Sequence, residues 1–166
     1  MKRFLAAFLL LLPCACIAGH PRQAVCGAEP SRGHIEFRQV TKREAWGLTI
    51  PFAEFSLKNA SSVRITFPIE GSDGLLVPHG AYEFLESRSR SSSDPWTMFD
   101  PNLDEFSPAA AWVSVDGGAE ITILSSVFGP MSVPDRARTQ EFRLRLKDAG
   151  GCEYVSQPFR LPDESR

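Results

Sequence analysis

The sequence predicts an all-β domain, a two-layer β-sandwich that folds outside the cytosol. From His34 onward, apolar and polar residues alternate in short stretches separated by turn residues, which is the period of half-buried strands. No window sustains the period of an amphipathic helix. An apolar leader and two distant cysteines in the rest of the chain indicate export and one cross-link.

The leader has the three parts of an export signal. A positive start and an apolar run over 4–12 precede small residues that end at Ala18, so we expect cleavage after Ala18 and delivery to the periplasm or the cell surface. Lipid anchoring at Cys16 is the less favoured alternative, because the residues before it match the lipoprotein pattern poorly. A membrane-spanning helix needs about 20 apolar residues, so we expect no transmembrane segment in the mature chain.

The remaining chain of about 148 residues has the size of one domain. We assign 19–33 to an N-terminal segment, 34–161 to the β-sandwich and 162–166 to a tail. The formal net charge is −2, and loss of Lys2 and Arg3 with the leader makes it −4. This balance argues against nucleic acid as a partner, because such binding needs a dense positive surface.

Cys26 and Cys152 are the two cysteines that remain after cleavage. In an oxidising compartment they form the one intramolecular disulfide available, and it would tether the 19–33 segment to the last hairpin. The chain-entropy model gives a stabilisation of roughly 5 kcal/mol for so long a loop. A redox role is not expected, because catalytic dithiols lie close together in sequence.

Alternation in the first half of the domain predicts several strands. Pro51 indicates a break or an edge within one of them. The polar turn 59–62 is expected to join its flanking strands as a hairpin, and the Asn59-Ala60-Ser61 glycosylation sequon is taken as part of that turn. The predicted strands cover 35–40, 46–59, 63–67, 75–77 and 81–86.

The second half of the domain contains two further predicted hairpins. Strands over 112–115 and 120–124 flank Asp116-Gly117-Gly118-Ala119, whose glycines suit a tight turn. In the final hairpin, the strand 142–147 leads through the turn 148–151 to a return strand. There Val155, Phe159 and Leu161 share one side, and Pro158 marks an edge or a bulge.

These strands number seven to nine, as is typical of a two-sheet sandwich, with a β-barrel as the alternative. Over 35–161 the layout resembles immunoglobulin-like or fibronectin-like sandwiches. The resemblance lies in the strand pattern alone: the antibody pattern places both cysteines on facing core strands, whereas Cys26 precedes the first strand here. It therefore implies no functional residues.

The first candidate site is the longest connection, 87–111. Its start is a basic tip, and its aromatic residues offer rigid contact area for a ligand. The interpretation that we favour is that 96–99 is a further strand whose side chains cover the core. The candidate binding-loop residues are Arg88, Arg90, Trp96, Phe99 and Phe106.

The second candidate site is a basic stripe. Arg143, Arg145 and Lys147 share one side of a predicted strand and would span about 14 Å. Such a stripe suits a phosphate-rich headgroup or an acidic partner. The interpretation that we favour is a solvated face that prevents strand pairing between molecules.

The sequence contains no recognisable catalytic or metal-binding pattern. Residues 100–105 depart from a calcium loop, because Glu105 stands at the glycine position and Ala111 at that of the closing glutamate. His34 and His79 fit no zinc spacing, and no serine lies in a nucleophile elbow. We therefore expect no metal, no cofactor and no enzymatic activity.

Together these observations favour an exported module that binds a protein or glycan of the cell envelope. One alternative is a carbohydrate-binding module in which two or more of Trp46, Trp96 and Trp112 form an exposed platform. The other is a small hydrolytic enzyme whose site is assembled from residues distant in sequence.

Overall fold

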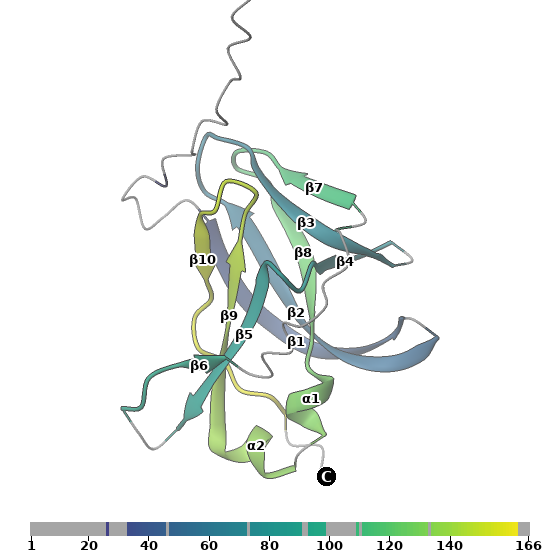
Figure 1. Cartoon of the computed structure of the whole chain (residues 1–166), viewed down its shortest axis with the longest axis vertical. Helices are drawn as coiled ribbons and strands as arrows, with labels where there is room; N and C mark the ends of the chain where they lie inside the picture. Colours follow the sequence, from purple (N-terminus) through teal and green to yellow (C-terminus); the bar gives the residue numbers. More distant parts are fainter. Residues whose placement is uncertain are drawn as a thin grey trace, which may run out of the picture.

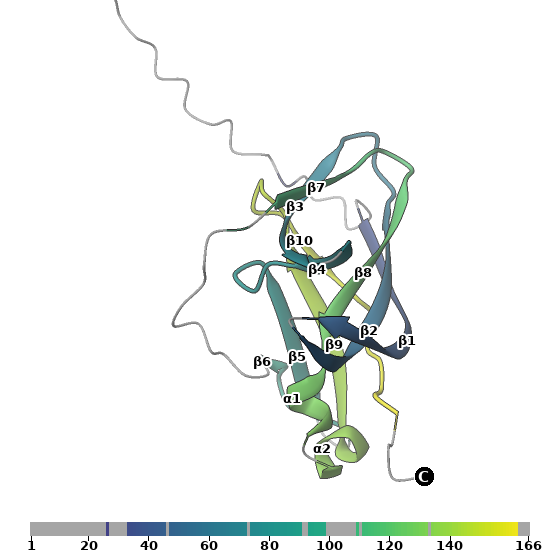
Figure 2. The ribbon, with the colours of Figure 1, turned by 90° about the vertical axis from the view of Figure 1, so that its right-hand side faces the viewer.

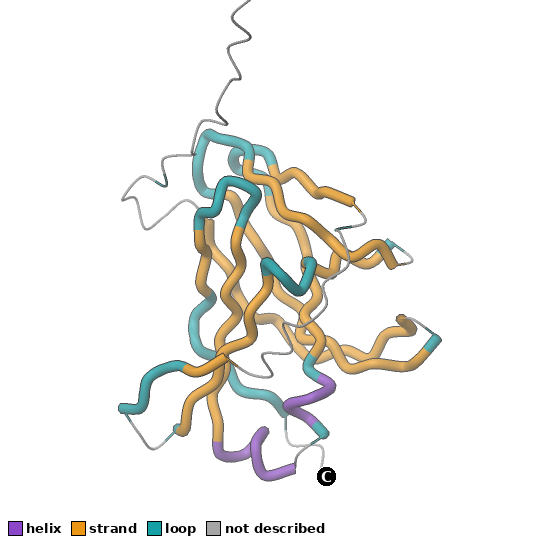
Figure 3. Tube along the Cα trace, in the orientation of Figure 1, coloured by secondary structure: helices purple, strands orange, loops and turns teal. Residues whose placement is uncertain are grey.

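The computed structural model describes residue 26 and residues 33–45, 47–72, 74–90, 93–98, 109, 111–132 and 134–162. These ranges contain ten strands and two short helices, and every strand pairing is antiparallel (Figures 1 and 3). The predicted all-β class is confirmed, and none of the three described sheets closes into a barrel. The count exceeds the predicted seven to nine because β6 (Thr97–Met98) is too short to show alternation.

One layer is the three-stranded sheet β1-β2-β8. Its first two strands form a long hairpin that turns at Gly47, where φ is 75°. The register shifts between Phe37 and Gln39, so Arg38 forms a bulge. The strands of this sheet are β1 (Gly33–Ala45), β2 (Leu48–Asn59) and β8 (Glu120–Ser126).

The other two sheets lie across the core from the first, with strand orders β10-β9-β5-β6 and β4-β3-β7 (Figure 2). The turn after β9 links them, because the Ala149 amide donates to the Thr66 carbonyl at 2.8 Å. Their remaining strands are β3 (Ile65–Ser72), β4 (Leu75–Pro78), β5 (Glu83–Ser89), β7 (Ala111–Val115), β9 (Gln140–Lys147) and β10 (Glu153–Val155).

All three sheets contribute to one apolar core. Phe55 from β2, Phe67 from β3 and Leu144 from β9 are among its members and are at most 3% exposed. A second, smaller cluster lies beneath β4, which contacts β8. We call this the small cluster; its buried members are Ala45, Phe52, Val77 and Leu124.

Two predicted hairpins are wrong, although their turns are present. The strands on either side of 59–62 and of 116–119 pair in different sheets, so each turn carries the chain from one layer to the other. Asn59 explains this arrangement. It is completely buried, its backbone bonds Gly118 and Ala119, and its side-chain amide donates to the carbonyls of Val63 and Val115. The sequon asparagine is therefore a structural residue.

The last hairpin is confirmed for β9 and β10, with one correction. Val155 does not face inward with Phe159 and Leu161 but is 43% exposed, and Tyr154 takes the inward position. The reason is that β10 ends at Val155 and pairing resumes only in the Phe142–Phe159 bridge, beyond Pro158. The side-chain alternation is thus not continuous between these residues.

Two helices interrupt the β pattern between β8 and β9. They are α1 (Phe128–Met131) and α2 (Pro134–Thr139), and each is too short to show a helical period in the sequence. Among the residues that the structure describes, no helix is both long enough and apolar enough to cross a membrane.

The expected disulfide joins Cys26 to Cys152, with their Cα atoms 5.4 Å apart. Cys152 lies in the buried core directly before β10. The bond therefore attaches residue 26 to the final hairpin, as predicted from the sequence.

Candidate functional site

The predicted basic stripe occupies the outer face of β9. Phe142, Leu144 and Leu146 take the inward positions, so Arg143, Arg145 and Lys147 point outward. The neighbouring strand β5 adds outward residues in register, because Glu86 lies opposite Arg143 and Arg88 lies opposite Glu141.

Trp96 brings the two predicted sites together. The guanidinium carbons of Arg88 and Arg143 lie 4.4 and 4.5 Å from the centre of its ring. Cation–π contacts of this kind contribute about 0.5–1 kcal/mol each at exposed sites. We call the resulting surface the Arg–Trp face; it comprises Glu86, Arg88, Trp96, Glu141, Arg143, Arg145, Lys147 and Glu153.

The rest of the predicted binding loop is only partly described. Thr97–Met98 does form a strand, as the favoured interpretation held, but Trp96 packs on the outer face rather than over the core. Arg90 is exposed at the end of β5, and its Nε donates to the Gln140 carbonyl at 2.9 Å. Phe99 and Phe106 lie outside the described residues.

Carboxylates from neighbouring strands pair with the basic stripe. Glu86 bonds Arg143 and lies 2.7 Å from Arg145, and Glu153 lies 3.1 Å from Arg145 and 4.0 Å from Lys147. A further pair joins Arg88 to Glu141 on the same face. Three carboxylates thus accompany four cations, and the face presents alternating charge rather than a positive patch.

The described tryptophans do not form one platform for a sugar. Trp96 lies against Arg88 near the end of β5, whereas Trp112 contacts Tyr82, just before the start of β5. A strand of this length spans about 20 Å, so the two indoles are well separated. Trp112 is 55% exposed, and its ring is inclined by 71° to Tyr82. Trp46 lies outside the described residues.

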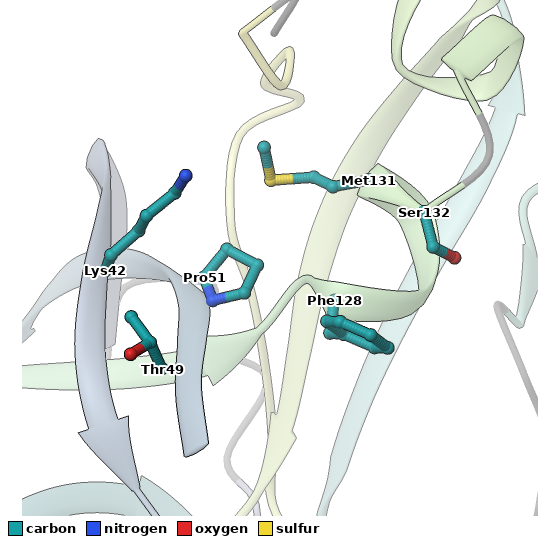
Figure 4. A pocket seen from close by; sticks show the side chains of 6 residues that line it. All are labelled: Lys42, Thr49, Pro51, Phe128, Met131 and Ser132. Carbon is teal, nitrogen blue, oxygen red and sulfur yellow. The ribbon is translucent and has the colours of Figure 1, made fainter.

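A groove of about 320 Å³ opens beside α1 (Figure 4). Near the turn of the long β1–β2 hairpin, Lys42 and Pro51 are cross-strand neighbours, and α1 forms the opposite wall. The bond from the Val127 amide to the Pro51 carbonyl, 3.1 Å long, anchors α1 there. Sequence reasoning missed the groove because α1 has no periodicity. It is lined by Lys42, Thr49, Pro51, Phe128, Met131 and Ser132.

A polar cluster that the sequence analysis also missed lies inside the fold. Glu83 is a half-buried residue whose carboxyl is desolvated, and this burial raises its pKa to about 8. The Ser125 hydroxyl opposes that rise in pKa, and the Glu70 carboxylate adds to it. One feature of the sequence could have predicted that Glu83 faces inward: it lies on the same side of its strand as Leu85.

The other buried groups do not complete a hydrolytic site in the described part of the chain. His79 is buried, and its Nδ1 accepts the Ala81 amide at 3.2 Å. Ser125 lies beside a carboxyl of raised pKa rather than hydrogen-bonded to a histidine base. The described residues include no group of three or more His, Cys, Asp or Glu side chains placed to hold a metal ion.

In comparisons with known proteins, no family model and no curated protein matches the sequence. A solved structure described as the "X-ray structure of Northeast Structural Genomics Consortium target SoR45" is similar to this chain with a TM-score of 0.35 and 7% sequence identity. The alignment covers 81% of this chain and 89% of that chain. A similarity at this level carries no conclusion about fold or function.

Proposed function

We propose that this protein is an exported, non-enzymatic module that binds a protein of the cell envelope through its Arg–Trp face. The observation that carries the proposal is the position of Trp96, held against two guanidinium groups on the outer face of β5 and β9. Tryptophan and arginine are the residues most enriched among those that dominate protein–protein binding energy.

The ion pairs of the face support this function in a second way. They hold long side chains in one arrangement before binding, which lowers the conformational entropy lost when a partner docks. Alternating charge also selects a partner with the complementary alternation. A phosphate-rich lipid surface fits less well, because it would face Glu86, Glu141 and Glu153.

Two features support export. The leader up to Ala18 has the composition of a signal sequence. The bond between Cys26 and Cys152 is of the kind that persists in oxidising compartments. We therefore place the module in the periplasm or at the cell surface, and the N-terminal mass of the mature protein distinguishes cleavage after Ala18 from lipidation at Cys16.

The test compares two tryptophan variants in an affinity experiment with envelope extract. The mature wild-type protein and Trp112→Ala, the matched control on β7, should retain the same protein, and Trp96→Ala should not. With that protein purified, Trp96→Ala should raise the Kd by roughly 30-fold, the effect of a dominant interface residue.

Two outcomes would contradict the proposal. One is equal retention of every protein by wild type and Trp96→Ala, with both folded by circular dichroism. The other is calorimetric binding of a cell-wall or plant polysaccharide that Trp112→Ala abolishes and Trp96→Ala does not, which would favour the carbohydrate-binding alternative.

A further inference from the structure

We propose that the edge strand β7 is a self-association site, at which two copies of this chain pair antiparallel about a twofold axis through Val113. The pairing joins two three-stranded β4-β3-β7 sheets into one continuous sheet. The proposal is independent of the Arg–Trp face, which lies on a different sheet. It rests on the hydrogen-bonding pattern of β7, on its comparison with the other sheet edges and on the residues on either side of its centre.

The backbone of β3 determines which groups of β7 are already bonded. The carbonyl of Thr66 accepts the Ala149 amide at 2.8 Å, and that of Pro68 accepts the His79 amide at 3.0 Å. Both donors lie on the side of β3 away from β7, and Pro68 has no amide hydrogen to donate toward β7. Because the amide and carbonyl of one residue point to the same side of a strand, and this side alternates, β3 bonds β7 through the residue between them, Phe67.

Two residues of β7 therefore direct their backbone groups to its free side. Phe67 lies opposite Val113, so Val113 bonds β3, while Trp112 and Ser114 point their amides and carbonyls away from it. The hydroxyls of Thr66 and Ser114 lie 3.1 Å apart, which fits a pair without backbone bonds, where side chains are closer. Within the described residues, no strand other than β3 pairs with β7 (Figure 1). Such an edge is a template for pairing with another strand.

The other edges of the described sheets are protected. Strand β1 has the bulge at Arg38 and the exposed charges of Lys42 and Arg43. Strand β6 has two residues, β10 has three and is followed by Pro158, and β4 and β8 contact each other. Strand β7 has five residues without a charge, a proline or a shift of register. It thus lacks the features that prevent pairing between molecules.

The residues of β7 are complementary to those of a second copy. An axis through Val113 places Trp112 opposite the partner's Ser114, so the indole, which is 55% exposed, lies beside a small side chain. The half-buried Val113 meets the partner's Val113, a β-branched pair at the closer, non-hydrogen-bonded spacing. Each copy offers two amides and two carbonyls, which would form four hydrogen bonds across the axis. A twofold dimer is also the commonest closed assembly of identical chains.

The expected dimer is weak. One pair of short strands buries less than about 1,200 Å² in total, the size class of transient complexes. We therefore expect a Kd of roughly 10 µM to 1 mM. Dimers should accumulate as the concentration of the protein rises.

Concentration-dependent measurements on the mature, oxidised protein provide the first test. Analytical ultracentrifugation from about 20 µM to about 1 mM should show a monomer–dimer equilibrium. Amide exchange followed by NMR should be fast at Trp112 and Ser114 in dilute solution and slower by at least about twofold at 1 mM. Val113, whose amide bonds β3, should be protected at both concentrations. Ser114→Pro removes an amide of the free side alone, so it should weaken the dimer at least about tenfold without unfolding β7.

Cysteine variants test the register. Opposed Val113 residues have Cα atoms about 4.5 Å apart, within the range of a disulfide, so Val113→Cys should cross-link two copies under mild oxidation. Ser114→Cys is the matched control. It is the more exposed position, but across this axis its Cα atom lies about 8 Å from that of the partner's residue, too far for a disulfide. Mass spectrometry identifies the linked peptides and checks that Cys26 and Cys152 remain joined.

Three results would overturn the proposal. The first is a protein that remains monomeric at 1 mM. The second is protection of the Trp112 and Ser114 amides that is already complete in the dilute monomer, because the edge would then be covered within one chain. The third is cross-linking of Ser114→Cys as fast as that of Val113→Cys, which would place the contact between copies elsewhere. If Ser114→Pro does not fold, the amide pattern and the cysteine pair decide without it.

Discussion

Replacing the buried turn residue Asn59 by alanine should destabilise the fold strongly. Both side-chain donor positions are used, since Nδ2 donates to the carbonyls of Val63 at 2.8 Å and Val115 at 2.9 Å. Oδ1 accepts the amide of Ser61 at 3.0 Å and its hydroxyl at 2.8 Å. One side chain thus holds together two of the turns at which the chain changes sheets.

The expected loss follows from the exposure of each partner. The bond to the Val115 carbonyl is buried, so its removal leaves an unsatisfied acceptor that costs about 1–3 kcal/mol. Val63 and Ser61 are near solvent, so water replaces their bonds and each loss is about 0.5–1 kcal/mol. The sum is about 3 kcal/mol, which lowers the Tm of a domain of this size by roughly 6–12 °C.

Urea denaturation at equilibrium measures the effect, with Ser61→Ala as the matched control. Ser61→Ala removes the hydroxyl bond to Asn59 but keeps the buried one, so it should lower the free energy of unfolding by about 1 kcal/mol or less. If Asn59→Ala costs no more than Ser61→Ala, the buried amide does not connect the two turns as argued.

The other predictions concern the core, the cross-link and the charged face. Leu144→Ala should lower the free energy of unfolding by about 2–5 kcal/mol without loss of β circular dichroism, because Leu144 is 0% exposed in the core; a loss under 1 kcal/mol would contradict its placement. Reducing the Cys26–Cys152 disulfide should cost about 2–5 kcal/mol, and an unchanged Tm in reductant would refute this. Glu86→Gln should cost about 1–3 kcal/mol in urea denaturation, since two guanidinium groups lose a shared, nearly buried partner; no loss would show that they find other partners.

Much of the strand pattern could be predicted because it is local. Phe142, Leu144 and Leu146 face inward and Arg143 and Arg145 outward, as expected, because successive side chains of a strand point to opposite faces. The prediction was wrong at Val155, where the strand ends and the alternation is interrupted.

The candidate site was predictable only in part. The outward position of the basic stripe came from its own strand, but the carboxylates that pair with it belong to β5 and β10. The contact of Trp96 with Arg88 and Arg143 depends on how the chain returns over the sheet after β5. The interior position of Glu83 could be inferred from its spacing of two residues from Leu85. Its neighbours Ser125 and Glu70 could not be inferred from the sequence.

The order of residues along this chain was sufficient to predict the β class, the disulfide partners and the inward or outward side of most strand residues. The β class and the facing of side chains depend on short-range backbone geometry, and the disulfide partners were predicted from the two cysteines that lie outside the expected leader. Which strands pair, and therefore which charges meet on the Arg–Trp face and around Glu83, was decided by the folded chain. Pairing depends on hydrogen bonds and packing between segments far apart in sequence, and here the buried amide of Asn59 helps to direct neighbouring strands into different sheets.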